Sequence, residues 1–289
     1  KENAMSQQAL GATNPNLTSS SYAKWREFPW WLVAIILFLV VMAILVFTGE
    51  EYRNAFEFIW GAPGDITAFG QGGIEAVVGK GITMTVYITL AAFVWALILG
   101  LLAGLGRVSK NVVLRNLATT YIEFVRGVPT VVLIFTLALV VVPSVAEFIG
   151  AQNSITNTSR AIAALAIIYG AFLGEVFRAG IESVPKGQME AAHSLGMTTF
   201  QAMRLVILPQ AIRNIMPALG NDFVAMLKDS SLVTLLAVRD LTQQAKLYSG
   251  SSFRFRETYL VLTFLYLTMT ITLSLVLRWY ERRIRTEER

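Results

Sequence analysis

The chain has no cysteine and only one histidine, His193, among its 289 residues. Without thiols, a disulfide framework and thiol chemistry are excluded, and without clustered histidine or cysteine there is little basis for a catalytic metal. A Gly-Lys-Ser or Gly-Lys-Thr phosphate loop is also missing, because the nearest match, Gly79-Lys80-Gly81, has Ile74 where the first glycine of such a loop should be. We therefore expect a chain that binds no metal, nucleotide or other cofactor by itself.

Charged residues are scarce as well. They make up 15% of the chain, whereas 55% of its residues are hydrophobic, a balance that soluble domains of this length do not reach. Apolar runs long enough to cross a hydrocarbon core of about 30 Å recur along the chain. We expect an all-α integral membrane protein with six transmembrane helices, at residues 30–48, 82–106, 119–142, 160–182, 211–228 and 258–279. Pro129 and Pro217 interrupt the third and fifth runs, which predicts kinks or unwound turns there.

The placement of lysine and arginine predicts the orientation in the membrane. Basic residues number 3, 3, 3 and 5 in segments 1–29, 107–118, 183–213 and 278–289, against 2, 1 and 4 in segments 49–80, 143–160 and 229–257. By the positive-inside rule, both termini are cytoplasmic. The segment 229–257 is the exception, and an amphipathic or re-entrant stretch stays open there.

These patterns divide the chain into four parts. We expect a polar, disordered cytoplasmic segment at 1–29, a first span with an external loop at 30–80, a core transmembrane domain at 81–280, and a basic cytoplasmic tail at 281–289. The core domain includes a polar loop at 183–211, which separates two of the apolar runs.

This loop has a helical pattern of its own. Pro185 sets the first turn of a short helix, and Gly196 can close that helix in the left-handed conformation. Thr198 and Gln201 then form a Thr-x-x-Gln capping box for a second short helix. This helix, glycine turn and second helix together predict a docking surface. An amphipathic connector packed on the rest of the protein fits the spacing equally well. A helix-turn-helix DNA reader fits poorly, because apolar runs flank the loop and no basic recognition helix follows.

The residues of the loop resemble a known motif. Glu190-Ala191-Ala192, followed by Gly196 and then Leu208-Pro209, is similar to the EAA motif of ABC importer permeases. Further matches narrow the resemblance to permeases for polar amino acids of the histidine, arginine, glutamine and glutamate type: Arg126-Gly127-Val128-Pro129, Glu175-Val176-Phe177-Arg178, Leu208-Pro209-Gln210-Ala211 and Leu227-Lys228-Asp229-Ser230-Ser231-Leu232. The resemblance extends over residues 80–285, most of the chain.

The resemblance implies a type I ABC importer permease fold in the bacterial inner membrane, with a five-helix core plus one extra N-terminal span. It implies that the loop docks on a separate ATPase subunit, which would carry ATP-Mg. It also implies a second permease subunit, identical or homologous, an extracytoplasmic amino-acid-binding protein, an amino-acid substrate and membrane lipid, but no nucleic acid. The residues that it assigns to ATPase coupling are Glu190, Ala191, Ala192, Leu195, Gly196 and Phe200.

Polar residues within the fifth apolar run are candidates for a substrate site. Asn221 and Asp222 lie inside this run, where a buried Asp costs about 2.5–3.5 kcal/mol on insertion scales. Such a cost implies that these residues have a binding partner or line a translocation path. Either a hydrogen bond to a neighbouring helix or a contact with substrate would account for them. In polar amino-acid permeases the helix after the docking loop contributes to the substrate site. The resemblance therefore implies that these two residues meet an α-amino group or a cationic side chain.

Arg126, Thr85 and Thr89 are further candidate substrate contacts, each with a structural alternative. Arg126 lies where the third run can break and present its guanidinium to a carboxylate, but it can also pair with Glu123 or Glu175. The two threonine hydroxyls can bind substrate or, as is more common, the carbonyls of their own helix.

Charged and small residues also predict internal contacts. Glu175 and Arg178 are three residues apart and can pair on one helix face, and Lys228 and Asp229 are further candidates for a gate or internal ion pair. The small-residue faces that favour close helix packing are Gly100-x-x-x-Gly104 and Gly170-x-x-x-Gly174.

We therefore expect a permease subunit of an ATP-driven importer, which moves a polar amino acid by alternating access and is not itself an enzyme. The alternative is an ion-coupled secondary transporter or channel that uses Asp222 and Arg126 as a charge relay. A membrane-embedded enzyme comes third, because no nucleophile, base or metal set converges. Which amino acid is carried, and whether the permease pair is a homodimer, stay open.

Overall fold

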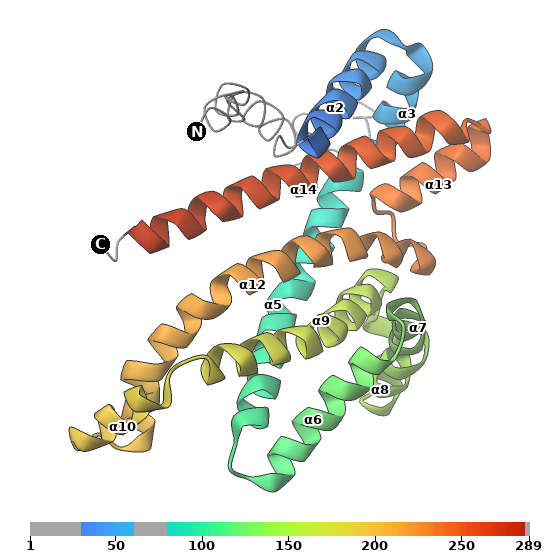
Figure 1. The fold of residues 1–289 in the computed structure, drawn as a ribbon. Coiled ribbons are helices and arrows are strands. Elements are labelled where there is room, and N and C mark those ends of the chain that lie inside the picture. The colour runs from blue at the N-terminus through green and yellow to red at the C-terminus, as the bar shows by residue number, and fades with distance from the viewer. Residues whose placement is uncertain (1–29, 61–79, 287–289) are drawn as a thin grey trace, which may run out of the picture. The chain divides into compact units, whose positions relative to one another are not determined.

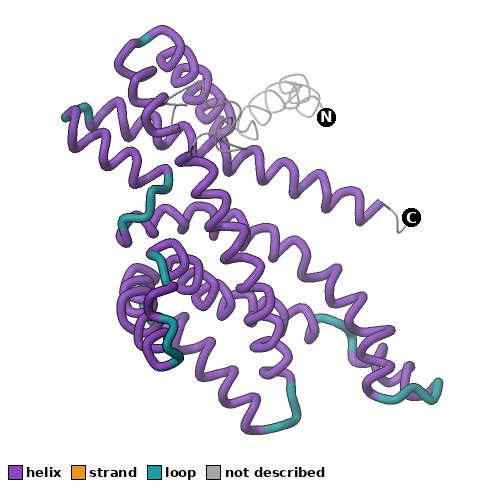
Figure 2. The backbone as a smooth tube through the Cα atoms, turned by 180° about the vertical axis from the view of Figure 1, so that it is seen from behind, coloured by secondary structure: helices purple, strands orange, loops and turns teal. Residues whose placement is uncertain are grey.

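The structure is a computed structural model, and it describes residues 30–60 and 80–286. The predicted polar segment at 1–29, and the greater part of the predicted external loop after the first span, lie outside the described residues. Every described element is a helix, and no strand occurs among the residues described (Figure 2). The predicted all-α class is confirmed.

The chain divides into two compact units, 1–44 and 45–289, and the first contains most of helix α2 (Trp30–Thr48). The described helices of the second unit are α3 (Glu50–Trp60), α5 (Lys80–Val108), α6 (Val112–Gly127), α7 (Thr130–Phe135), the π-helix η2 (Thr136–Val141), α8 (Val142–Phe148), the 3-10 turn η3 (Gln152–Ser154), α9 (Asn157–Glu182), α10 (Lys186–Ser194), α11 (Thr199–Ala202), the π-helix η4 (Met203–Ile207), α12 (Leu208–Asp229), the 3-10 helix η5 (Ser230–Leu236), α13 (Leu241–Ser252) and α14 (Phe255–Thr286).

Helices α5 and α9 form the centre of the second unit, where α5 crosses α9 and α12 (Figure 1). A Cβ atom added to Gly100 would lie 2.6 Å from Leu173 Cβ, and one added to Gly104 would lie 2.6 Å from Phe177 Cβ. Real side chains do not approach so closely, so glycine is what lets these backbones meet. The predicted small-residue faces are thus confirmed as a packing contact within the chain.

Four described helical segments are long and apolar enough to cross a membrane: Gly81–Val108, Thr130–Phe148, Asn157–Glu182 and Phe255–Glu281. The pair Leu32–Thr48 and Glu50–Trp60 makes a fifth if it counts as one span. Helix α12, at the place of the predicted fifth run, is not among these segments; it contains Arg213, Asn214, Asn221, Asp222 and Lys228. The described residues therefore support four or five spans by this criterion, where the sequence predicts six.

The two interrupting prolines have different effects. Val128 is extended (φ −111°, ψ 139°), as expected for a residue before proline, so α6 ends there and α7 begins after Pro129. The third apolar span consequently begins at residue 130 and not at 119. Pro217 lies inside α12, which continues through it. One backbone hydrogen bond is lost at a proline, but the packing of α12 on α9 and α14 holds the helix together, and no unwound turn forms there.

The segment 229–257 is folded and mostly helical. It contains η5 and α13, which are separated by the left-handed residue Ala237 (φ 55°). The Asp240 carboxylate caps α13 by accepting hydrogen bonds from the backbone N–H groups of Thr242 (3.2 Å) and Gln243 (2.9 Å). Two short helices, η5 and the capped α13, therefore connect α12 to α14.

Candidate functional site

The predicted docking loop begins where α9 ends and contains α10, a glycine turn and α11. Gly196 has φ +78°, and the N–H groups of Gly196 and Met197 donate to the carbonyls of His193 (2.9 Å) and Ala192 (3.1 Å). This pattern is a Schellman motif, which needs a left-handed residue directly after the helix. The predicted role of Gly196 in closing the helix is confirmed. Pro185 precedes the first turn as the N-cap residue.

The second short helix carries the predicted capping box. The Thr198 N–H donates to Gln201 Oε1 (2.9 Å), and the Gln201 N–H donates to Thr198 Oγ1 (3.3 Å). From α11 the chain continues through η4 directly into α12. The loop and α12 are therefore mechanically continuous, so that a displacement of the loop acts on α12.

The loop has a buried side and an exposed apolar side. Ala192 and Ala202 are buried, whereas Leu195, Phe200 and Leu205 are exposed by 78%, 73% and 62%. The loop lies beyond the ends of α9 and α12 (Figure 1), and these three apolar side chains are exposed there. The other predicted coupling residues, Glu190, Ala191 and Gly196, are exposed on the same loop.

Two acidic residues of α12 have contrasting environments. Asp229 Oδ2 accepts a hydrogen bond from the hydroxyl of Tyr169 on α9 (2.9 Å). Asp222 Oδ2 is buried and has no hydrogen-bond partner among the described residues, while the adjacent Asn221 is exposed. A buried carboxylate oxygen without a partner is costly. Asp222 therefore has a carboxylate oxygen that no described residue satisfies.

The other predicted substrate contacts lie on different helices. The Thr85 hydroxyl donates to the Gly81 carbonyl (3.0 Å) and accepts from the Leu241 N–H (3.2 Å), and the Thr89 hydroxyl donates to the Thr85 carbonyl (2.8 Å). Both threonines are buried, whereas Arg126 is exposed in the last turn of α6. No hydrogen bond or ion pair joins any of the three to Asn221 or Asp222 within the described ranges.

A chain of ion pairs joins α5, α6 and α9. Arg107 Nη1 lies 2.9 Å from Glu175 Oε2 and 3.3 Å from Glu123 Oε1. Arg178 pairs with both Glu175 and Glu182. The ion pair that the spacing predicts between Glu175 and Arg178 is present, and Arg107 extends it to two further helices.

Sequence reasoning missed Arg107. The two glutamates that it pairs with are the ones expected as possible partners of Arg126. Which arginine these glutamates pair with depends on which helix ends lie together, and the spacing of residues along the sequence does not indicate this. Lys228 and Asp229, the other two candidates for a gate or internal ion pair, form no ion pair with a described residue, and Asp229 accepts a hydrogen bond from Tyr169 of α9.

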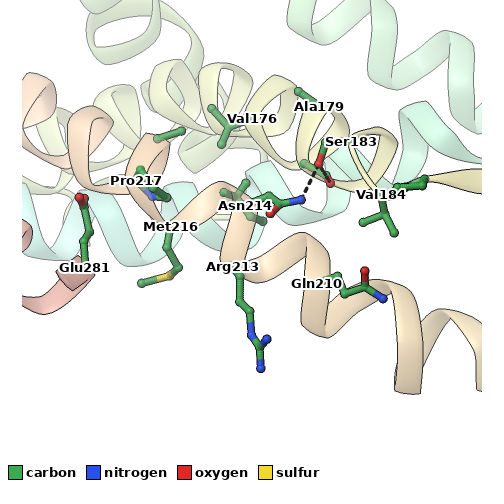
Figure 3. Close-up of a pocket in the computed structure, with 14 residues that line it drawn as sticks. Val176, Ala179, Ser183, Val184, Gln210, Arg213, Asn214, Met216, Pro217 and Glu281 are labelled. Atoms are coloured by element: carbon green, nitrogen blue, oxygen red, sulfur yellow. Dashed lines mark hydrogen bonds between the residues drawn. The ribbon is translucent and has the colours of Figure 1, made fainter. Parts of the chain in front are cut away.

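A cavity of about 690 Å³ lies between α9, α12 and α14, next to the docking loop (Figure 3). Asn214 Nδ2 donates to Ser183 Oγ across it (2.8 Å), which ties α12 to the end of α9. Gln210, Arg213 and Glu281 add further polar groups to its lining. Most of its lining residues are nonpolar, with these few polar groups among them, and its size lies in the range of small-molecule pockets. Elsewhere in the described residues, no group of three or more His, Asp or Glu side chains is arranged to hold a metal ion.

A second cavity lies at the other end of α12, and its polar wall was also missed. Thr263, Tyr266 and Thr270 of α14 line it together with Lys228. Their spacing of three and four residues indicates one helix face. Hydroxyls in apolar helices usually bond to their own backbone, however, so the spacing alone does not indicate a cavity.

These features define a class: an all-α, multi-pass membrane protein with a folded helical loop between two of its long helices. Residues 96–286 match the family model described as binding-protein-dependent transport system inner membrane component. The chain belongs to this family. It is accordingly a permease component of an ABC importer in the inner membrane, and permease subunits are not themselves enzymes.

Relatives and a solved structure agree with this assignment. The chain is 38% identical over 203 residues to the probable amino-acid permease protein YxeN of Bacillus subtilis (strain 168), covering 70% of this chain and 89% of YxeN. It is 32% identical over 206 residues to the glutamine transport system permease protein GlnP of Escherichia coli (strain K12), covering 71% and 92%. The crystal structure of an amino acid ABC transporter with histidines matches with a TM-score of 0.63 at 39% identity, covering 70% and 92%. The predicted permease fold is confirmed, and only the number of spans is not.

Proposed function

We propose that this protein is the membrane-spanning subunit of an importer that moves a polar amino acid into the cytoplasm, driven by ATP hydrolysis on a separate subunit. The observation that carries the proposal is the exposed apolar surface of Leu195, Phe200 and Leu205 on a loop held by a Schellman motif and a capping box. An apolar groove on an ATPase subunit is the complement of such a surface. The loop and both termini are cytoplasmic in this proposal.

The same arrangement supports a mechanism of alternating access. Two permease subunits enclose the path, and two ATPase subunits bind their loops. When ATP draws the ATPases together, the loops move with them, and α9 and α12 rock because both are attached to the loop and to each other through Ser183 and Asn214. An extracytoplasmic binding protein delivers the amino acid to the outward-open state, and hydrolysis resets the cycle.

For the cargo, we propose that Asn221 and Asp222 contact its α-amino group or a cationic side chain. Support comes from the buried Asp222 oxygen that no described residue satisfies. A glutamine permease and a transporter crystallised with histidines are among the similar proteins, which supports a polar amino acid. The threonines at 85 and 89 have no part in this proposal, because their hydroxyls are already bonded within the protein.

Asp222→Asn tests this contact. An ammonium group bound to a carboxylate forms a charge-assisted hydrogen bond, which is about twice as strong as a neutral one. We expect the cargo concentration for half-maximal uptake to rise about tenfold, with assembly unchanged. Uptake in proteoliposomes measures it, and Asp229→Asn is the matched control, since Asp229 bonds to Tyr169. Uptake kinetics in Asp222→Asn equal to those of the wild type would assign this residue a structural role only.

Gly196→Asp tests the docking loop. A side chain at φ +78° strains the turn, and a carboxylate adds charge to an apolar docking surface. Because nothing lies within 4 Å of an added Cβ atom, steric clash inside the permease does not contribute. We expect Gly196→Asp to abolish uptake and to uncouple or release the ATPase, measured by copurification and ATP hydrolysis.

The matched control is Gly250→Asp on α13. An added Cβ atom is equally free there, Gly250 does not have a positive φ, and the residue is not part of the loop. This variant should import the amino acid like the wild type. Normal uptake and normal ATPase copurification in Gly196→Asp would contradict the docking hypothesis.

A further inference from the structure

The turn between α13 and α14 exposes two aromatic rings beside two arginines. Its sequence is Phe253-Arg254-Phe255-Arg256, in which aromatic and basic residues alternate. Helix α13 ends directly before this turn, and α14 begins within it. The two rings are exposed by 79% and 52%. We call residues 253–256 the aromatic corner, and none of them lines either cavity or belongs to the docking loop.

Phe253 has a backbone conformation that phenylalanine disfavours. It has φ 58° and ψ 16°, in the left-handed region where glycine or asparagine is usual. Its N–H group donates to the Ser249 carbonyl (2.9 Å) and closes the last turn of α13, which glycine would do without strain. Because most of the ring is exposed, packing within the chain does not offset this strain. The ring is therefore placed for a contact outside the chain.

The corner is held in position by the elements around it. The Arg254 N–H donates to Ser252 Oγ (3.3 Å), and the Arg254 carbonyl accepts from the Thr258 N–H (3.2 Å) in the first turns of α14. The Arg254 guanidinium lies 3.4 Å from a carboxylate oxygen of Glu51 on α3. A turn bonded in this way presents its rings in a fixed position, so little ordering is needed when they meet a partner.

Two further cations accompany the corner. Lys246, about two turns before Phe253 on α13, and Arg256 are exposed, and neither forms an ion pair with a described residue. The acids nearby are Glu51, which pairs with Arg254, and Glu257, which lies in the first turn of α14. Positive charge thus prevails at the corner, and ammonium and guanidinium groups bind phosphate oxygens well.

The position of the corner in the chain indicates the surface of the membrane. The segment Phe255–Glu281 is long and apolar enough to cross a membrane, so the corner lies where a span begins. In the proposed orientation this end is extracytoplasmic, where the positive-inside rule disfavours basic residues. Segment 229–257 nevertheless carries four of them. Their presence on this side indicates a binding function, and basic residues interleaved with aromatic rings are typical of the headgroup layer of a bilayer.

We propose that the aromatic corner is a binding site for anionic phospholipids of the outer leaflet. The rings of Phe253 and Phe255 lie among the headgroups and the upper acyl chains. Arg256 and Lys246 bind phosphate oxygens. The ligand class is a phospholipid with net negative charge, such as phosphatidylglycerol, because the two cations repel the choline or ammonium group of a zwitterionic headgroup. Only the choice of leaflet rests on the proposed function, in which the docking loop is cytoplasmic.

A single label beside the corner tests the site, because the chain has no cysteine of its own. Ser251 is exposed two residues before Phe253, and Ser251→Cys accepts a bimane label. The labelled permease is assembled with its ATPase subunits in phosphatidylcholine vesicles. These vesicles contain an equal minor fraction of either brominated phosphatidylglycerol or brominated phosphatidylcholine. Bromine quenches the label at short range, so quenching reports which lipid lies beside the corner.

We expect the apparent affinity of the corner for brominated phosphatidylglycerol to exceed that for brominated phosphatidylcholine by about fivefold or more, because each basic residue near an anionic surface contributes about fivefold. Lys246→Gln combined with Arg256→Gln should remove this preference. Lys110→Gln is the matched control and should keep it, since this exposed cation lies between α5 and α6, away from the corner.

Phe253→Gly separates the lipid contact from a structural role. Glycine adopts φ 58° without strain, so the thermal stability of this variant in detergent should equal or exceed that of the wild type. Quenching by both brominated lipids should fall, because the corner loses a ring that holds it in the bilayer. Phe253→Trp should restore quenching, since tryptophan favours the interface. Lower stability with unchanged quenching in Phe253→Gly would assign the ring to the fold and overturn its part in the site.

Equal quenching by the two lipids in the wild type would overturn the anionic ligand class. A label quenched by neither lipid, but shielded when binding protein is added, would show that the corner meets a soluble partner and would overturn the lipid site. In both cases, intact uptake by the same vesicles leaves the permease function standing. A wild-type complex that imports no amino acid, and whose ATPase does not respond to loaded binding protein, would overturn the proposed function itself.

Discussion

Asp240 shows, at the scale of a single residue, how burial changes the chemistry of a carboxyl group outside the spans. Its side chain is fully buried at the start of α13. Burial raises its pKa from 3.8 to about 6, although the hydrogen bonds from Gln243, Thr242 and Tyr266 favour the charged form and oppose this shift. Desolvation therefore outweighs these bonds, and the group is ionised at neutral pH at a cost to the fold.

The sign of the resulting pH dependence follows from the raised pKa. Between about pH 4 and pH 6 the folded state holds a proton on Asp240 that the unfolded state has released, so this group's contribution to stability is lost as pH rises through this window. Asp240→Asn removes the titration. We expect the stability of this variant, relative to wild type, to be higher at pH 7.5 than at pH 4.5 by roughly 2–3 kcal/mol. Thermal unfolding of both proteins in detergent measures it, and a difference independent of pH would contradict it.

Single residues were predictable where the signal is local. Gly196 and the pair Thr198 and Gln201 act through backbone groups within five residues, so their roles can be predicted from spacing alone. Arg107 could not be found in this way, because its two carboxylate partners are 16 and 68 residues away. The three hydroxyl residues of α14 that line the second cavity could not be predicted either, because the cavity depends on which helices pack beside α14.

At the scale of helices, the contrast between α9 and α12 explains which spans the sequence predicts well. Helix α9 is the most buried of the apolar spans, and glycines at its contact with α5 meet side chains at less than 3.0 Å from an added Cβ. The middle of this helix, residues 161–174, has no charged residue, and its composition predicts the span. Helix α12 is polar enough to fail a hydropathy criterion, because it carries charges towards both the loop and the interior. Polar residues within a membrane helix thus lower the mean hydropathy by which a span is recognised.

The two prolines also differ in how well the sequence predicts their effect: the helix ends before Pro129 but continues through Pro217. The extended conformation before Pro129 is a local steric effect and ends α6 as predicted. The outcome at Pro217 depends on tertiary support, since α12 packs on α9 and α14. A proline therefore predicts a weak point in a helix, and the neighbouring helices decide whether the helix ends there.

For the second unit as a whole, the arrangement places a series of polar features along α12. The docking loop and the first cavity lie at its start, Asp222 follows within the helix, and the second cavity begins at Lys228. Helix α9 connects the same loop to the packed centre, where it meets α5. In the proposed mechanism, movement of the loop reaches the path only if the end of α9 stays attached to α5 and α6. We expect the ion pairs around Glu175 to provide this attachment.

Glu175→Gln tests this role. Glu175 bonds to Arg107 on α5 and to Arg178 on α9, and all three side chains are no more than 26% exposed. Replacing the charge leaves two partly buried guanidinium groups without their shared carboxylate, which should cost about 1–2 kcal/mol of stability after allowance for solvent screening. Because α9 leads directly into the docking loop, a looser attachment should also lower the ratio of cargo-stimulated to basal ATP hydrolysis. Glu182→Gln is the matched control, since this residue is 55% exposed and pairs within α9 only. Equal loss of stability and of coupling in both variants would show that the contact between helices is not what transmits the movement.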